Sequence, residues 1–151
     1  GFGMWIESCD FGGLAPTDIH HNNITGHGGD GIFSVDCPGF IQNNTVRNNA
    51  LLGPDFHGIH IFDSSGAVVM KNTVQSSNVG IFIEEVDTCT ISFNSISFNT
   101  IGIDLFDSDG CTLARNNVSR STIVDCQWDQ VGSHTFTANA CGTETPPGAW
   151  D

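Results

Sequence analysis

The sequence predicts an all-β solenoid, a parallel β-helix of about six stacked coils with about 22 residues in each coil. Two repeated patterns support this prediction. Asn with Ile or Val two places later recurs at intervals of 22, 28, 22 and 22 residues, and a degenerate copy follows after 23 more. Gly before an apolar residue begins a strand at four further positions. These positions are Asn22, Asn44, Asn72, Asn94, Asn116 and Asn139, and Gly31, Gly58, Gly80 and Gly102.

Each repeat contains short segments that alternate apolar and polar residues, which is typical of strands with one buried face. Hairpins would need a turn dipeptide at every reversal and would not keep one register over all copies. Parallel coils stacked about 4.8 Å apart place equivalent residues of every repeat in the same register. We expect the repeated Asn to form a ladder at a bend. The expected inward columns are Ile32, Ile59, Ile81 and Ile103; Ser34, Ile61, Ile83 and Leu105; and Val46, Val74, Ile96 and Val118.

The repeat resembles the right-handed parallel β-helix family, the pectate-lyase-like superfold, over residues 3–141. The resemblance implies the handedness, which the spacing alone does not give. It implies little about function, because this superfold hosts lyases, hydrolases, epimerases, adhesins and phage spikes. The expected organisation is a single domain of residues 1–151, with regular coils over 3–120 and an irregular last coil and C-terminal cap over 121–151.

Charge and hydropathy exclude several classes of partner. Four basic residues face 17 acidic ones, and the net charge of −13 repels nucleic acid and anionic membranes. No apolar run approaches the roughly 20 residues that a membrane span needs. The chain begins at Gly without a hydrophobic leader, as expected of a processed secreted protein or of a fragment. We therefore expect an extracellular or cell-surface protein with neither nucleic-acid binding nor membrane insertion.

The cysteines also indicate an oxidising compartment. Cys9 and Cys37 are 28 residues apart, which is the local coil spacing, and Cys89 and Cys111 are 22 apart, so each pair is expected to stack on adjacent coils. Cys126 and Cys141 form the remaining candidate pair. A reduced, buried column is the alternative for Cys89 and Cys111. Glycosylation sequons, relevant in a eukaryote, stand at Asn23, Asn43 and Asn117.

Two places depart from the repeat spacing. Residues 50–56 and the segment between Cys9 and Ile19 are longer than the coil requires, and they are expected to form protruding loops, either functional or neutral. The first coil starts at once, so its edge is expected to be blunted, buried by another chain or extended by missing sequence. Burial by a copy of the same chain would allow stacking into filaments. The last coil is expected to be covered by Trp128, Phe136 and Trp150.

Alternation along the Gly-Ile strand places two columns of aromatic and acidic side chains on its outer face. Rings stack on the C–H faces of sugars and carboxylates accept bonds from hydroxyls, so this mixture is typical of a glycan-binding face. It is equally typical of a protein–protein interface, where outward apolar columns must be covered. The face comprises Trp5, Phe33, His60, Phe62, Phe82, Glu84, Asp104 and Phe106.

An acid ends each of these strands: Asp36, Asp63, Glu85 and Asp107. Strict alternation would direct it inward, so the chain is expected to turn there. Stacked carboxylates about 5 Å apart repel one another by about 1 kcal/mol per pair in water. A bound Ca²⁺ would relieve this repulsion, and a solvated acidic ridge is the alternative.

The strongest catalytic candidates, Asp55, His57 and His60, lie where the inserted loop meets its strand, and Asp30 and Asp36 lie one coil earlier. Asp-Gly-apolar on one coil and His-Gly-apolar on the next is similar to alginate-type C5-epimerases and related lyases. The resemblance implies that His57 and Asp36 share proton abstraction from C5 of a uronate. The chain departs from that family because it contains no tyrosine. It also has no basic residue beside His57 to neutralise the substrate carboxylate.

These observations favour a non-catalytic role. We expect a structural or adhesive module that presents its acidic and aromatic face to glycans or to copies of itself. The alternative is a polysaccharide lyase or C5-epimerase that acts on uronate glycans through Asp36, Asp55, His57 and His60, with Ca²⁺ as the cofactor.

Overall fold

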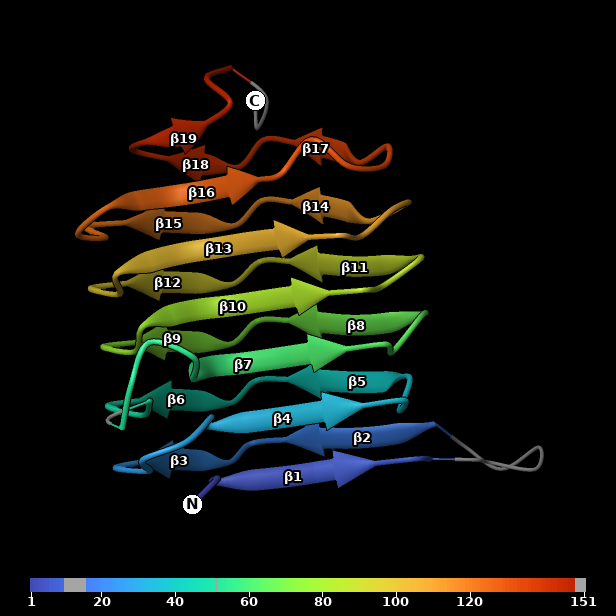
Figure 1. The fold of residues 1–151 in the computed structure, drawn as a ribbon, viewed down its shortest axis with the longest axis vertical. Coiled ribbons are helices and arrows are strands. Elements are labelled where there is room, and N and C mark those ends of the chain that lie inside the picture. Colours follow the sequence, from blue (N-terminus) through green and yellow to red (C-terminus); the bar gives the residue numbers. More distant parts are fainter. Residues whose placement is uncertain (10–15, 51, 149–151) are drawn as a thin grey trace.

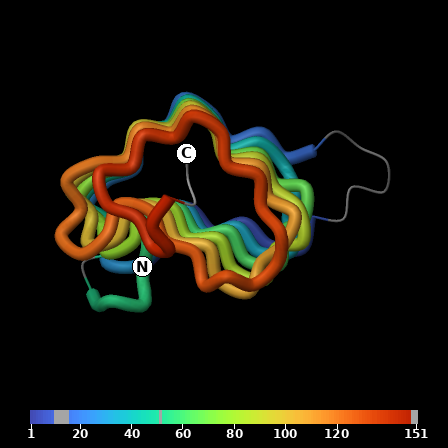
Figure 2. Tube along the Cα trace, turned by 90° about the horizontal axis from the view of Figure 1, so that it is seen from above, coloured from blue at the N-terminus to red at the C-terminus, as the bar shows by residue number. Residues whose placement is uncertain are grey.

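The computed structural model describes residues 1–9, 16–50 and 52–148. These residues form strands and no helix. It follows that the described part of the chain contains no helix that could cross a membrane. The strands run parallel and stack coil on coil from the N-terminus to the C-terminus (Figure 1). Seen along the stack, successive coils superimpose around a common interior (Figure 2). The predicted all-β solenoid of about six coils is confirmed.

Each coil contributes strands to three sheets. The seven-stranded sheet, called the long sheet below, contains β1 (Met4–Glu7), β4 (Ile32–Val35), β7 (His57–Phe62), β10 (Val79–Glu84), β13 (Ile101–Phe106), β16 (Val124–Trp128) and β19 (Glu144–Thr145). The second sheet contains β2 (Thr17–His20), β5 (Gly39–Gln42), β8 (Ala67–Met70), β11 (Cys89–Ser92), β14 (Thr112–Ala114) and β17 (Thr135–Thr137). The third contains β3 (Asn23–Thr25), β6 (Thr45–Arg47), β9 (Thr73–Gln75), β12 (Ser95–Ser97), β15 (Asn117–Ser119) and β18 (Ala140–Cys141).

The core consists of the predicted inward columns. Ile59 pairs in register with Ile81, which pairs with Ile103, and all three are fully buried. Burial of each such side chain stabilises the fold by about 1.5–3 kcal/mol. Because every coil repeats the contact, the core is a continuous apolar rod. The three predicted columns are confirmed.

Close approach of two sheets explains why Gly precedes the strands of the long sheet. A Cβ atom added to Gly58 would lie 2.6 Å from the carbonyl oxygen of Gly80 and 2.6 Å from Cγ1 of Val74. At Gly102 the added atom would lie 2.2 Å from Cγ1 of Val118. The coil is narrow where the long sheet faces the valine column of the third sheet, so a side chain does not fit.

The repeated Asn forms the predicted ladder at the bend between the second and third sheets. Asn44 Nδ2 donates to the Ile19 carbonyl at 2.8 Å and to Asn72 Oδ1 at 3.1 Å, and the Asn44 backbone N–H donates to the same Oδ1 at 2.9 Å. The same pattern continues through Asn94 and Asn116. These buried amides are satisfied by the coils above and below.

Three disulfides join Cys9 to Cys37, Cys89 to Cys111 and Cys126 to Cys141. All three predicted pairs are confirmed, and the reduced alternative for the second pair is wrong. Stacking on adjacent coils brings Cα atoms within bonding reach, with Cα separations of 4.7 Å and 4.4 Å for the first two pairs.

The C-terminal segment of the chain continues the solenoid. Residues 121–148 contribute strands β16 to β19 to the three sheets, and Trp128 and Phe136 pack against the core. Trp150 lies outside the described residues, as does most of the predicted loop after Cys9.

Candidate functional site

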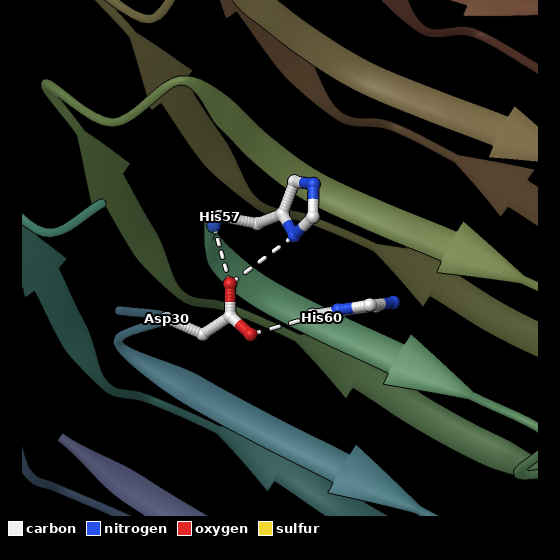
Figure 3. A group of neighbouring side chains, drawn as sticks. All are labelled: Asp30, His57 and His60. Atoms are coloured by element: carbon white, nitrogen blue, oxygen red, sulfur yellow. Dashed lines mark hydrogen bonds and ion pairs between the residues drawn. The ribbon is translucent and has the colours of Figure 1, made fainter. Parts of the chain in front are cut away.

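The candidate site begins with two residues at equivalent positions on adjacent coils. Asp30 and His57 each lie two residues before one of the paired residues Ile32 and Ile59, so they are neighbours across β4 and β7. His57 Nδ1 is 3.1 Å from Asp30 Oδ1, and the His57 backbone N–H donates to the same oxygen. Both side chains are buried. Figure 3 shows the carboxylate directed at both groups of His57.

His60 completes the group from the next outward position of β7. Its Nδ1 lies 3.6 Å from Asp30 Oδ2, and its Nε2 lies 3.0 Å from Glu84 Oε2 on β10 (Figure 3 shows the first contact). The rings of Phe33 and Phe82 lie on either neighbouring strand, with centroids 4.8 Å and 5.0 Å from that of His60. Register thus fixes the imidazole between two carboxylates and two aromatic rings.

The buried carboxylate is charged. Burial raises the pKa of Asp30, but hydrogen bonds from His57 and His60 outweigh this effect and hold the pKa below its ordinary value. Asp30 is 2 % exposed, so its negative charge has little access to water. A buried carboxylate between two imidazoles is stabilised by a proton on one of them or by a metal ion.

The ligand atoms of Asp30, His57 and His60 all lie within 4.8 Å of one another. Across residues 1–9, 16–50 and 52–148 this is the one cluster of three or more histidine, cysteine or carboxylate ligands with such spacing. Two kinds of chemistry suit it. The three donors can hold a metal ion, or His57, oriented by a carboxylate, can act as a general base.

A cavity of about 410 Å³ opens beside the two histidines. The inserted loop contributes Pro54 and Asp55 to its lining, and the side chain of Asn78 donates to the Pro54 carbonyl. The long sheet contributes the outward side chains of β10 and β13. Among the described residues that line the cavity, none is Lys or Arg. The remaining lining residues are His57, His60, Val79, Phe82, Glu84, Ile101 and Asp104.

The acids of this cavity repel one another. Burial raises the pKa of Asp104 to about 6, and the carboxylates of Asp129 and Glu84 add to the rise. Gln127 Nε2 donates a hydrogen bond to Asp104 Oδ2 at 2.7 Å, and this bond opposes the rise in the pKa of Asp104. Asp104 therefore takes up a proton in mildly acidic solution and is mainly an ionised hydrogen-bond acceptor at neutral pH.

Of the four residues predicted as catalytic, His57 and His60 meet in the cluster and Asp55 lines the same cavity. Asp36 does not join them. It follows β4 at the end opposite Asp30, on an exposed bend. The carboxylate beside His57 is that of Asp30.

The predicted outward columns of the long sheet are present, since Trp5, Phe33, His60, Phe82 and Asp104 pair in register from strand to strand. Trp5 is 52 % exposed. The second column, which holds Phe62, Glu84 and Phe106, also follows register, and Phe106 is 49 % exposed.

The acids that end these strands lie at a turn, as expected. Asp36, Asp63, Glu85 and Asp107 are exposed and have positive φ values of 48°, 45°, 53° and 46°. In the described part of the chain these acids form no cluster with metal-ligand spacing. Calcium binding by this column stays a prediction. Glycosylation also stays a prediction, and the side chains of Asn23, Asn43 and Asn117 are exposed.

Two residues of the candidate site were not predicted as its members from the sequence. Asp30 carries the same signal as His57, since each precedes a Gly that begins a strand of the long sheet. Glu84 belongs to the predicted outer face. Its contact with His60 was not predicted, because the two residues stand in different outward columns and their side chains lean toward each other.

Comparison with known proteins places the fold in a family. A family model described as "Periplasmic copper-binding protein (NosD)" matches residues 2–140. No curated protein and no solved structure gives a significant match. The periplasmic description agrees, at a coarse level, with the predicted location outside the cytoplasm. Because the match spans nearly all the coils, the chain belongs to the NosD family of right-handed parallel β-helix proteins.

Proposed function

We propose that this chain binds a copper ion through Asp30, His57 and His60. The observation that carries the proposal is the convergence of one buried carboxylate and two imidazoles from adjacent coils. The description of the family names copper. The chain would then act outside the cytoplasm as a rigid β-helix module that holds the ion at one place on its long sheet.

The spacing of the donors supports a single bound ion. Bonds from such donors to a metal are about 2.0–2.2 Å long, so ligand atoms of one ion lie about 3–4 Å apart. The two oxygens of Asp30 lie 3.1 Å from His57 Nδ1 and 3.6 Å from His60 Nδ1. In a metal-bound form, the ion would replace the proton shared by Asp30 and His57.

The donor set favours Cu(II). Imidazole nitrogen and carboxylate oxygen suit Cu(II), whereas Cu(I) is selected by thiolate and thioether sulfur. All six cysteines are in disulfides. Glu84 supports the same assignment, because a proton on His60 Nε2 directed at Glu84 leaves Nδ1 free to bind the ion. His57 and His60 line the cavity, so further coordination positions would face it.

Titration of the full chain with Cu(II), followed by calorimetry and electron paramagnetic resonance, tests this proposal. We expect His57→Ala to weaken the tight site about tenfold or more and to reduce the nitrogen hyperfine coupling in the spectrum, because one of two imidazole ligands is lost. The matched control is His27→Asn, because Asn49 and Asn99 occupy the corresponding place in later coils. Unchanged affinity and spectrum in folded His57→Ala would contradict the proposal.

We also propose a glycan-binding role for the cavity and the adjoining outer face, because one specific feature favours it. The cavity combines apolar side chains with Asp55, Glu84, Asp104 and the amide of Asn78, and a sugar presents both C–H faces and hydroxyls. Since no Lys or Arg appears among the described lining residues, the lining favours a neutral glycan over an anionic uronate. Its volume is at the lower end for small-ligand sites, which are about 300–1,000 Å³.

Nuclear magnetic resonance titration with neutral oligosaccharides and with uronate oligomers separates the alternatives. Shifts confined to β10 and β13 with neutral sugars are expected, and Asp104→Ala should remove them. A cleaved or epimerised uronate product that disappears in His57→Ala would instead support the lyase or C5-epimerase alternative. Self-association into filaments stays a prediction, and electron microscopy of the purified chain tests it.

A further inference from the structure

We infer that a second metal site lies at His20 and His21, where β2 ends. His20 Nδ1 and His21 Nδ1 are 2.7 Å apart, and both side chains are exposed. This pair belongs to the second sheet and its bend, whereas the three-ligand cluster belongs to the long sheet. The expected ligand is a divalent transition-metal ion that favours imidazole, with Cu(II) as the strongest binder of the series.

The backbone explains how adjacent residues come to share a site. Along a strand, neighbouring side chains point to opposite faces. His21 has a positive φ of 58°, which turns the chain and brings its ring toward that of His20, with ring centroids 5.0 Å apart. Two ligands in adjacent positions of a tetragonal ion are about 2.8 Å apart when the bonds are about 2.0 Å long. The observed nitrogen separation matches that spacing.

The bend that presents the pair is held in place. Asn22 Nδ2 donates to the His20 carbonyl at 3.0 Å and to Asn44 Oδ1 at 3.0 Å, so the Asn ladder anchors the backbone next to both histidines. Metal binding therefore needs little reorganisation of the main chain. Asp18, two residues before His20 on the same face of β2, adds a negative charge that favours a cation.

The two nitrogens are already paired with each other. Without a metal, only one proton fits between them, so one ring donates and the other accepts. A metal ion replaces that proton and binds both lone pairs. With two protein ligands in an exposed setting, the remaining positions are left to water, which makes this a weaker and more exchangeable site than the buried cluster.

Other coils supply a conservative test. Gln42 and Asn43 occupy the same two positions one coil later, and Asn43 also has a positive φ, so His20→Gln with His21→Asn preserves the bend. In the full chain carrying His57→Ala and His60→Ala, we expect one equivalent of Cu(II) to bind in a non-coordinating buffer. Adding His20→Gln and His21→Asn should weaken this binding about tenfold or more.

Measurements in the wild-type background keep the outcome clear if the quadruple variant does not fold. There, His20→Gln with His21→Asn should lower the copper stoichiometry by one, while His27→Asn leaves it unchanged. If the stoichiometry stays the same, the second site does not exist. If copper binding survives His57→Ala unchanged and disappears in His20→Gln with His21→Asn, the second site stands and the proposed three-ligand site fails.

Discussion

Two buried polar regions of this solenoid follow opposite rules. The Asn ladder repeats on every coil, and each amide is satisfied by its counterparts above and below. The column that contains Asp30 and His57 is polar on only two coils and continues as Val79 and Ile101. A polar group that every coil repeats serves the architecture, whereas one that interrupts an apolar column needs another explanation. Function is therefore best sought where the repeat fails.

Breaking the ladder should have the largest effect. In Asn72→Ala, the Asn44 amide groups and the Ile41 carbonyl lose their partners inside the core. We expect the free energy of unfolding to fall by about 3–5 kcal/mol, since each unsatisfied buried group costs about 1–3 kcal/mol. Denaturant titration measures this. Asn117→Ser is the control, because Asn117 is exposed and pairs with Ser95 in register, and it should change stability by less than about 0.5 kcal/mol.

Replacing His57 by valine, the residue that pairs with it on the next coil at position 79, tests whether this polar pair serves function or the fold. His57→Val leaves the Asp30 carboxylate buried without its imidazole, and should cost about 2–3 kcal/mol. Adding Asp30→Val removes that charge and should restore part of the loss, while copper binding stays absent. A double variant less stable than the single one would mean that the pair supports the fold as the ladder does.

Glu84→Gln probes the support of the metal site without touching its three ligands. The amide is a weaker acceptor for His60 Nε2–H, so copper affinity should fall by about tenfold. Stability should change by less than about 0.5 kcal/mol because Glu84 is partly exposed. Calorimetric titration and thermal unfolding, done on the same samples, separate the two effects. Equal losses in both would assign Glu84 to packing.

The smallest effect is expected from Asp104, whose pKa is raised to about 6. Between about pH 4 and 6 the unfolded chain has released this proton while the folded one still holds it, so this group lowers stability as the pH rises, and the loss levels off once the pH passes the folded-state pKa of about 6. Asp104→Asn should therefore reduce the fall in the free energy of unfolding over that range by about 1 kcal/mol. An unchanged pH profile would indicate that Asp104 ionises as in water.

Most of the fold could be predicted from the sequence, because in a solenoid the residues that lie one repeat length apart are in contact. Residues 22 positions apart, such as Asn94 and Asn116, are neighbours on adjacent coils, and the same arithmetic pairs Cys89 with Cys111. The site was only partly predictable. His57 and His60 were predicted, but the resemblance to C5-epimerases implied Asp36 as the partner of His57, whereas the carboxylate that contacts His57 is that of Asp30.

The remainder depends on geometry that spacing does not encode. The left-handed conformation that brings His20 and His21 together recurs at the same bend on later coils, as at Asn43 and Lys71, but the spacing alone does not show that this bend turns two adjacent side chains toward each other. The contact between His60 and Glu84 depends on side-chain direction across two outward columns. Both contacts depend on side-chain direction, which the periodic pattern does not specify.

The disulfides have a mechanical consequence. One joins the coil of β1 to that of β4, another joins the coil of β11 to that of β14, and the third lies within the coil of β16 and β18. No disulfide therefore links the coil of β4 to that of β7, or the coil of β7 to that of β10. Across these coils Asp30 contacts both His57 and His60, and His60 in turn contacts Glu84. Under a force applied to the two ends, coils that no disulfide joins are expected to separate first, and a metal ion held by Asp30, His57 and His60 would add a reversible cross-link between the coils of β4 and β7.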